Sequence, residues 1–159
     1  MFRTQLAKVV LVSAALMLPA SIATVAFTGG VAAAASDSAA CSKLSGTVSG
    51  TSATGALTKC TDTAATDAKG TFSGSVSTTT GTIAWANGAK TTMTISYSIE
   101  GQGSCTSSND DEIIVTGTVK KSTGKAKSSI KKGQPVSADI CYNTSTNKLT
   151  LVPKTKFEV

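Results

Sequence analysis

The stretch Gly81-Thr-Ile-Ala-Trp-Ala-Asn-Gly-Ala-Lys-Thr-Thr-Met-Thr-Ile-Ser-Tyr-Ser-Ile-Glu100 decides the fold class of this chain. Apolar side chains occupy alternate positions on both sides of the pair Asn87-Gly88. They are Ile83 and Trp85 before the pair, and Met93, Ile95, Tyr97 and Ile99 after it. A period of two is typical of strands with one buried face, and Asn-Gly readily takes the positive φ angles of a type I′ turn. Residues 81–100 therefore predict a β-hairpin, with Trp85 in the core rather than on a ligand-stacking surface.

The same alternation predicts further strands along the rest of the chain. They cover residues 44–48, 56–60, 72–76, 113–120, 136–142 and 148–152, and the tail around Phe157 is a candidate edge strand. Residues 61–69 and 101–111 are expected to be loops, and residues 122–134 either a third loop or a frayed strand around 126–130. About eight antiparallel strands predict an all-β fold, either a β-sandwich or a small β-barrel.

The N-terminus has the pattern of a cleavable signal peptide. Arg3 and Lys8 precede an apolar run over residues 9–18, and small residues then lead to Ala35. We expect cleavage after Ala35, with a cut after Ala23 or an uncleaved anchor as alternatives. Lipidation of Cys41 fits less well, because the apolar residue usual three positions earlier is missing. The predicted organisation is a signal peptide over 1–35 and a single secreted domain over 36–159, with no transmembrane segment after cleavage.

The four cysteines all follow the predicted cleavage site. Export places them in an oxidising compartment, and their number is even, so the sequence predicts two disulfides. Three connectivities are possible. We favour Cys41–Cys60 with Cys105–Cys141, because each bond then ties neighbouring segments. Each should stabilise the fold by about 3 kcal/mol, which matters in a domain with few large apolar side chains.

Three segments carry a resemblance to a known group of proteins. They are Leu44-Ser45-Gly46-Thr47-Val48-Ser49-Gly50, then Gly55-Ala56-Leu57-Thr58-Lys59-Cys60, and Thr82-Ile83-Ala84-Trp85 followed by a glycine turn. With the signal peptide, the chain resembles the small Thr/Ser/Gly-rich secreted proteins common in actinobacteria. The resemblance implies export and a β fold, and it transfers no catalytic residue.

The residue types present exclude the common catalytic arrangements. The chain has no histidine, which Ser-His-Asp and Cys-His hydrolases require, and cysteines in disulfides cannot act as nucleophiles. Ser-x-x-Lys begins at Ser122, Ser128 and Ser129, but the partner motifs that accompany it in enzymes are missing. The sequence therefore predicts a protein that is not an enzyme and binds no cofactor.

The one acidic cluster of the sequence is Asn109-Asp110-Asp111-Glu112, whose oxygen atoms are potential calcium ligands. Dense oxygen ligands suit Ca²⁺, but the alternating aspartates and central glycine of calcium loops are absent. We expect a solvated loop there and no metal site.

Between Glu112 and Asp139 the chain carries six lysines and no acidic residue. They are Lys120, Lys121, Lys125, Lys127, Lys131 and Lys132. Gathered on one face, they would attract anionic polymers such as wall teichoic acids, anionic lipid head groups or extracellular DNA. Specific nucleic-acid binding is not expected, because this segment contains neither arginine nor interleaved aromatic residues. The alternative interpretation is a solvated face that protects a strand edge from aggregation.

These observations favour a secreted or cell-surface, non-enzymatic β-domain that binds anionic envelope polymers through its lysines. A small-ligand carrier with an inter-sheet pocket is the alternative, and an unrecognised hydrolase is the third hypothesis. Export itself follows from the N-terminal pattern and does not depend on which of these is right.

Overall fold

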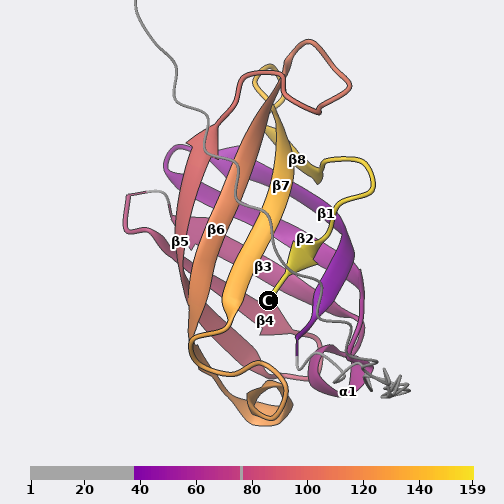
Figure 1. The fold of residues 1–159 in the computed structure, drawn as a ribbon, viewed down its shortest axis with the longest axis vertical. Coiled ribbons are helices and arrows are strands. Elements are labelled where there is room, and N and C mark those ends of the chain that lie inside the picture. The colour runs from indigo at the N-terminus through magenta and orange to yellow at the C-terminus, as the bar shows by residue number, and fades with distance from the viewer. Residues whose placement is uncertain (1–37, 76) are drawn as a thin grey trace, which may run out of the picture. The chain divides into compact units, whose positions relative to one another are not determined.

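The computed structural model describes residues 38–75 and 77–159, which form a closed antiparallel β-barrel of eight strand positions (Figure 1). The predicted signal peptide, residues 1–35, lies outside the described residues, and so does Val76. Of the two architectures that the strand pattern allowed, the protein adopts the barrel.

Seven strands follow one another around the wall, each antiparallel to the next. They are β1 (Ala40–Ser49), β2 (Ser52–Cys60), β3 (Lys69–Ser75), β4 (Thr80–Trp85), β5 (Lys90–Ile99), β6 (Asp110–Ser122) and β7 (Pro135–Asn143). All seven predicted regions are confirmed as strands, and the observed strands extend beyond most of the predicted limits. The alternation of small polar and apolar residues is thus enough to predict the strands that form the wall of this barrel.

Two short strands share the eighth position, between β7 and β1. The strand β8 (Lys148–Leu151) pairs with β7 and with Ser45–Thr47 of β1, while β9 (Phe157–Glu158) pairs with the first residues of β1 and with Ser137 of β7. The predicted edge strand around Phe157 is therefore real, but it is not an edge. It completes a closed wall, which leaves no long unpaired strand.

The side chains of alternate residues point into the barrel and form its core. Leu57, Ile83, Met93 and Val119 are fully buried, and Trp85 is 3% exposed. The core position predicted for Trp85 is confirmed. Its indole Nε1 donates a 3.0 Å hydrogen bond to Thr91 Oγ1, so the one polar atom of the ring is satisfied inside the barrel.

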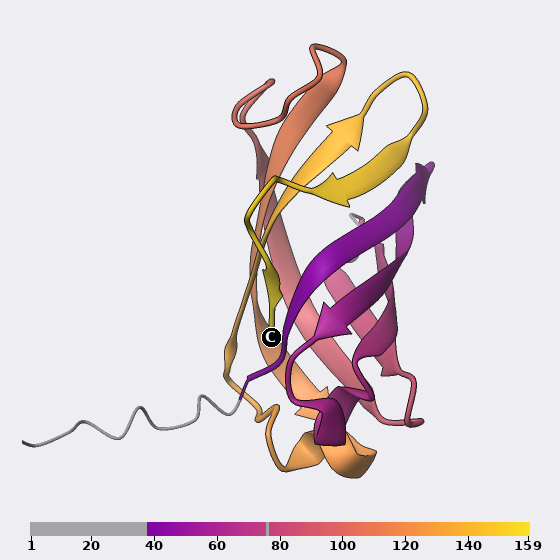
Figure 2. The same ribbon diagram turned by 90° about the vertical axis from the view of Figure 1, so that its right-hand side faces the viewer.

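The two ends of the barrel differ, as Figure 2 shows. The end at the top of the figure, here called the mouth, carries the β1–β2 and β7–β8 turns and the β5–β6 loop. The opposite, closed end carries the helical turns α1 (Thr63–Thr66) and η1 (Gly124–Lys127), with Ala65, Ala126 and Ile130 buried beneath them. Among the described residues, no helix has the length and hydropathy that crossing a bilayer requires.

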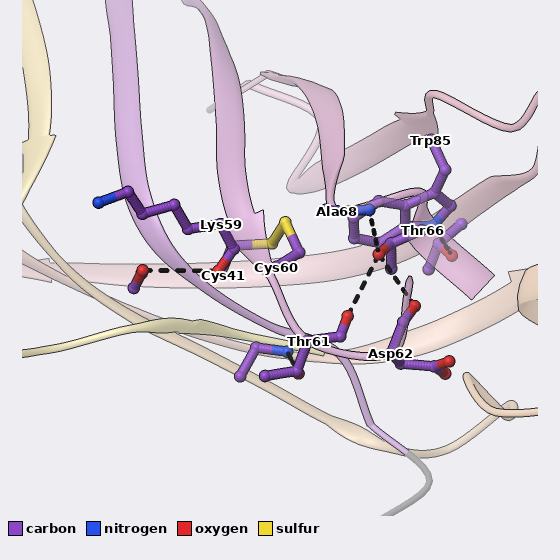
Figure 3. Close-up of a disulfide and its surroundings, with 11 residues drawn as sticks. Cys41, Lys59, Cys60, Thr61, Asp62, Thr66, Ala68 and Trp85 are labelled. Carbon is purple, nitrogen blue, oxygen red and sulfur yellow. Dashed lines mark hydrogen bonds between the residues drawn. A yellow bond between two sulfur atoms is a disulfide. The ribbon is translucent and has the colours of Figure 1, made fainter. Parts of the chain in front are cut away.

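The segments expected to be the loops 61–69 and 122–134 contain these helical turns, and the alternative of a strand around 126–130 is wrong. An element of four residues is too short to show a helical period. Local hydrogen bonds hold α1 instead, since Thr66 Oγ1 donates to the backbone carbonyls of Thr61 and Asp62 (Figure 3).

The disulfides are Cys41–Cys60 and Cys105–Cys141, which confirms the favoured pairing. The first joins β1 to β2 at the closed end, beside α1 (Figure 3). The second ties the β5–β6 loop to β7 near the mouth. Because the Sγ atom of Cys41 is bonded to Cys60, it is not available for attachment of a lipid.

The predicted hairpin of residues 81–100 is confirmed as β4 and β5, but its turn differs from the expected type I′. The loop has three residues, 86–88, because Trp85 N–H donates to Ala89 O. Within it Gly88 takes a positive φ of 83°. The side chain of Asn87 instead binds neighbouring backbone, donating to Ala65 O at 2.7 Å and accepting from Ala89 N–H at 2.9 Å. The asparagine therefore joins the turn to α1.

Candidate functional site

The mouth of the barrel contains an apolar cavity of about 300 Å³. Its lining residues come from eight of the strands and from the β1–β2 turn. They are Val48, Gly50, Ala53, Phe72, Ile95, Tyr97, Ile99, Ile113, Val115, Ile140, Tyr142, Leu149 and Phe157. Small-molecule sites typically measure about 300 to 1,000 Å³ and are lined mainly by apolar side chains. The cavity is at the lower limit of that range.

Two aromatic rings form the floor of the cavity. The rings of Phe72 and Phe157 have centroids 5.9 Å apart and planes inclined at 51°. The Phe72 ring folds over Gly74 of its own strand and Gly81 of β4: a Cβ at Gly74 would lie 2.6 Å from its Cζ, and one at Gly81 would lie 3.3 Å from its Cε2. The rings thus separate the cavity from the filled core below.

The rim of the cavity exposes apolar surface. Tyr97 is 46% exposed and Ile99 is 60% exposed, although both continue the inward-facing series of β5. Across the barrel, the Tyr142 hydroxyl donates a 2.7 Å hydrogen bond to Asn147 Oδ1 in the β7–β8 turn. Apolar side chains left open to water at the entrance of a cavity are typical of a binding site.

The β5–β6 loop beside the mouth is held in place by Glu112. This side chain is 9% exposed, and its Oε2 accepts a 2.5 Å hydrogen bond from Ser104 N–H. A side chain at Gly103 would collide with the same carboxylate, and Gly103 also has a φ of 47°. With the Cys105–Cys141 disulfide, this contact fixes the loop at two adjacent points.

The lysine-rich segment lies at the closed end, on the far side of the molecule from the cavity. Five of its six lysines line one groove of about 700 Å³. They are Lys120, Lys121, Lys127, Lys131 and Lys132. The remaining groove residues are Ser122, Thr123, Gly124 and Ile130. Lys125 is exposed on η1 and is not part of the groove.

The other residues singled out in the sequence have local structural contacts. Asp110 accepts a 2.6 Å hydrogen bond from the Asn143 side chain. Of the serines in Ser-x-x-Lys matches, Ser122 is buried and hydrogen-bonded to Thr91, and Ser128 Oγ donates to Lys125 O. These contacts give the acidic cluster and two of the three serines a role in holding turns and strands.

The sequence suggested a carrier with an inter-sheet pocket as an alternative function, but it did not identify the residues that line the cavity. Its signal was present in the strand pattern, since Tyr97 and Ile99 extend the apolar series of β5 further than the core requires. No protein-family model, no curated protein and no solved structure matches this chain. What the molecule offers by its own geometry is a closed eight-stranded barrel with an apolar mouth and a lysine groove at the other end.

Proposed function

We propose that this protein is an exported, non-enzymatic carrier that binds a small, uncharged, apolar molecule in the mouth of its barrel. The observation that carries the proposal is the cavity of about 300 Å³ above Phe72 and Phe157. Burying apolar surface of a ligand there would gain roughly 25 cal/mol per Å², and would also cover Tyr97 and Ile99.

The chemistry of the lining limits the class of ligand. Among the described residues that line the cavity, the polar side-chain groups are the hydroxyls of Tyr97 and Tyr142. A charged ligand would lose its hydration without gaining an ionic partner, which is costly in an apolar site. The walls therefore favour a neutral molecule, with at most a hydroxyl or carbonyl group near the rim.

Export is part of the proposal and is supported by two independent features. The first 35 residues have the pattern of a signal peptide, and disulfides persist mainly in oxidising compartments. A carrier outside the cytoplasm also benefits from a closed, cross-linked wall, because such a wall keeps the cavity formed when it is empty.

The test is binding of the neutral dye Nile red to the oxidised domain, followed by its fluorescence. We expect saturable one-to-one binding, and we expect Ala53→Phe to weaken it by about tenfold or more, because the new ring occupies ligand space. The matched control is Ala56→Phe, the same change at an exposed position of β2. Equal binding by both variants, or no saturable binding by the native domain, would contradict the proposal.

A further inference from the structure

We infer that the groove at the closed end binds a linear, base-free phosphodiester polymer, such as a poly(glycerol phosphate) chain of a cell envelope. This second site goes beyond the carrier function, since it would hold the protein at a surface while the mouth stays open. On β6, five positions separate Val115 of the cavity lining from Lys120 of the groove, which corresponds to roughly 17 Å along the strand.

The lysines of the groove are mounted on a well-packed frame. Ala126 and Ile130 are fully buried, and they anchor the segment between β6 and β7 to the core. The returning chain is tied to β6 as well, since Gly133 N–H donates to Val119 O at 2.8 Å and Val119 N–H donates to Gln134 O at 2.9 Å. The positive charges are therefore held together before any ligand arrives, which lowers the entropic cost of binding.

The end of β6 is fixed in the same way on the other side of the groove. Thr123 N–H and Thr123 Oγ1 both bind the carbonyl oxygen of Lys90 on β5, at 2.8 and 3.3 Å. The adjacent Lys120 and Lys121 occupy consecutive exposed positions, because a register shift interrupts the β5–β6 pairing at Thr92/Met93. This irregularity places both side chains on the outside of the barrel, where regular alternation would turn one of them inward.

The charge of the groove selects an anionic partner. Between Glu112 and Asp139 the chain has six lysines and no acidic residue. The acidic residues that flank nearby α1 are Asp62 and Asp67, and Asp62 caps that helix through Ala65 N–H. Several lysines around one concave surface raise the local potential and match a chain with regularly spaced phosphates.

The side chains around the lysines distinguish among anionic partners. Nucleic-acid sites generally add aromatic platforms for the bases and planar arginines, and the groove lining contains neither. A membrane surface is usually held by exposed apolar side chains as well as charge, yet Ile130, the one large apolar residue of the lining, is fully buried. The lining of lysine, serine, threonine and glycine suits a hydrophilic phosphate chain.

The test measures binding of poly(glycerol phosphate) to the oxidised domain by calorimetry between 50 and 200 mM NaCl. If all five groove lysines contact phosphates, affinity should fall roughly a hundredfold over this range by counterion release. A variant with Lys120, Lys121, Lys127 and Lys132 changed to Gln should bind weakly, with a salt dependence of only about threefold. All four side chains are exposed, so the fold should be unchanged.

The matched control changes four exposed lysines near β1, β8 and β9 to Gln, namely Lys43, Lys148, Lys154 and Lys156. It removes the same charge and should bind the polymer almost as the native protein does. An equal loss in both variants would overturn the inference, because net charge rather than the groove would then be responsible. Equal or tighter binding to oligothymidylate or to anionic phospholipid vesicles would overturn it too. Nile red binding should be the same in both variants, so failure here is distinguishable from failure of the carrier proposal.

Discussion

The rings of Phe72 and Phe157 meet inside the barrel with their centroids 5.9 Å apart, and both rings line the apolar cavity. The two residues belong to β3 and β9, which lie far apart in the sequence and are not paired strands. Their contact therefore couples the last strand of the closed wall to the floor of the binding site. A barrel that failed to close at β9 would lose that floor.

Replacing Phe72 by Ala should destabilise the domain by about 3 to 5 kcal/mol, since it removes a buried aromatic ring and joins the cavity to the core. Phe72→Leu should cost clearly less, because most of the volume is kept. Urea unfolding of the oxidised proteins measures both values. A loss below about 1 kcal/mol for Phe72→Ala would mean that the ring does not support the core as described.

Much of this architecture could be predicted from the sequence because a strand with one buried face leaves a period-two pattern. The hairpin around Asn87-Gly88 follows from such local information. The disulfide pairing was one of three possible connectivities and was favoured because each bond ties neighbouring segments. Closure of the barrel does not, since it depends on two short strands, β8 and β9, meeting different parts of β1. The strand pattern therefore could not decide between a β-sandwich and a β-barrel.

The two candidate sites differ in how far the sequence predicts them, because one depends on residue type and the other on unfilled volume. A cluster of lysines between Glu112 and Asp139 is visible in the sequence, and five of the six line one groove. The cavity depends on volume rather than on residue type. It exists because Phe72 folds over Gly74 and Gly81 and no side chain fills the level above. The strand pattern shows that the apolar series of β5 continues to Ile99, but it does not show how much volume stays unfilled between the side chains.

The two disulfides should contribute differently to stability and to the mouth. Cys105 and Cys141 are separated by 36 positions and Cys41 and Cys60 by 19. In the chain-entropy model, replacing Cys105 and Cys141 by Ser should cost about 4 kcal/mol, and replacing Cys41 and Cys60 by Ser should cost about 3 kcal/mol. Amide hydrogen exchange in residues 101–109 should become faster in the variant that lacks the Cys105–Cys141 bond and stay unchanged in the variant that lacks the Cys41–Cys60 bond. The opposite pattern would show that the Cys105–Cys141 bond does not hold the loop.

Glu112 should stabilise the β5–β6 loop through the hydrogen bond that Ser104 N–H donates to its carboxylate. Glu112→Ala leaves that N–H without its acceptor in a half-buried position and should cost about 1 to 3 kcal/mol. Glu112→Gln keeps an acceptor oxygen and should cost about half as much or less, because only the charge is lost. Urea unfolding compares the two. If Gln proved as damaging as Ala, the loss of charge would be responsible rather than the loss of the acceptor.

Thr91 lies at the centre of a buried polar chain, accepting from Trp85 Nε1 at 3.0 Å and lying 3.1 Å from Ser122 Oγ. Thr91→Val keeps the shape but leaves the indole N–H without a partner, so we expect a loss of about 1 to 3 kcal/mol in the free energy of unfolding. The matched control is Thr94→Val on the outer face of β5, where the hydroxyl meets Thr118 and the change should stay within about 0.5 kcal/mol.

A double-mutant cycle separates this hydrogen bond from general packing around Thr91. Trp85→Phe removes the indole N–H, so Thr91→Val should cost less in the Trp85→Phe background, by about 0.5 kcal/mol or more. Urea unfolding of the four proteins gives the coupling energy directly. Additive losses would show that the Trp85–Thr91 contact contributes shape alone. In that case the two hydroxyls of Thr91 and Ser122 would satisfy one another without the ring.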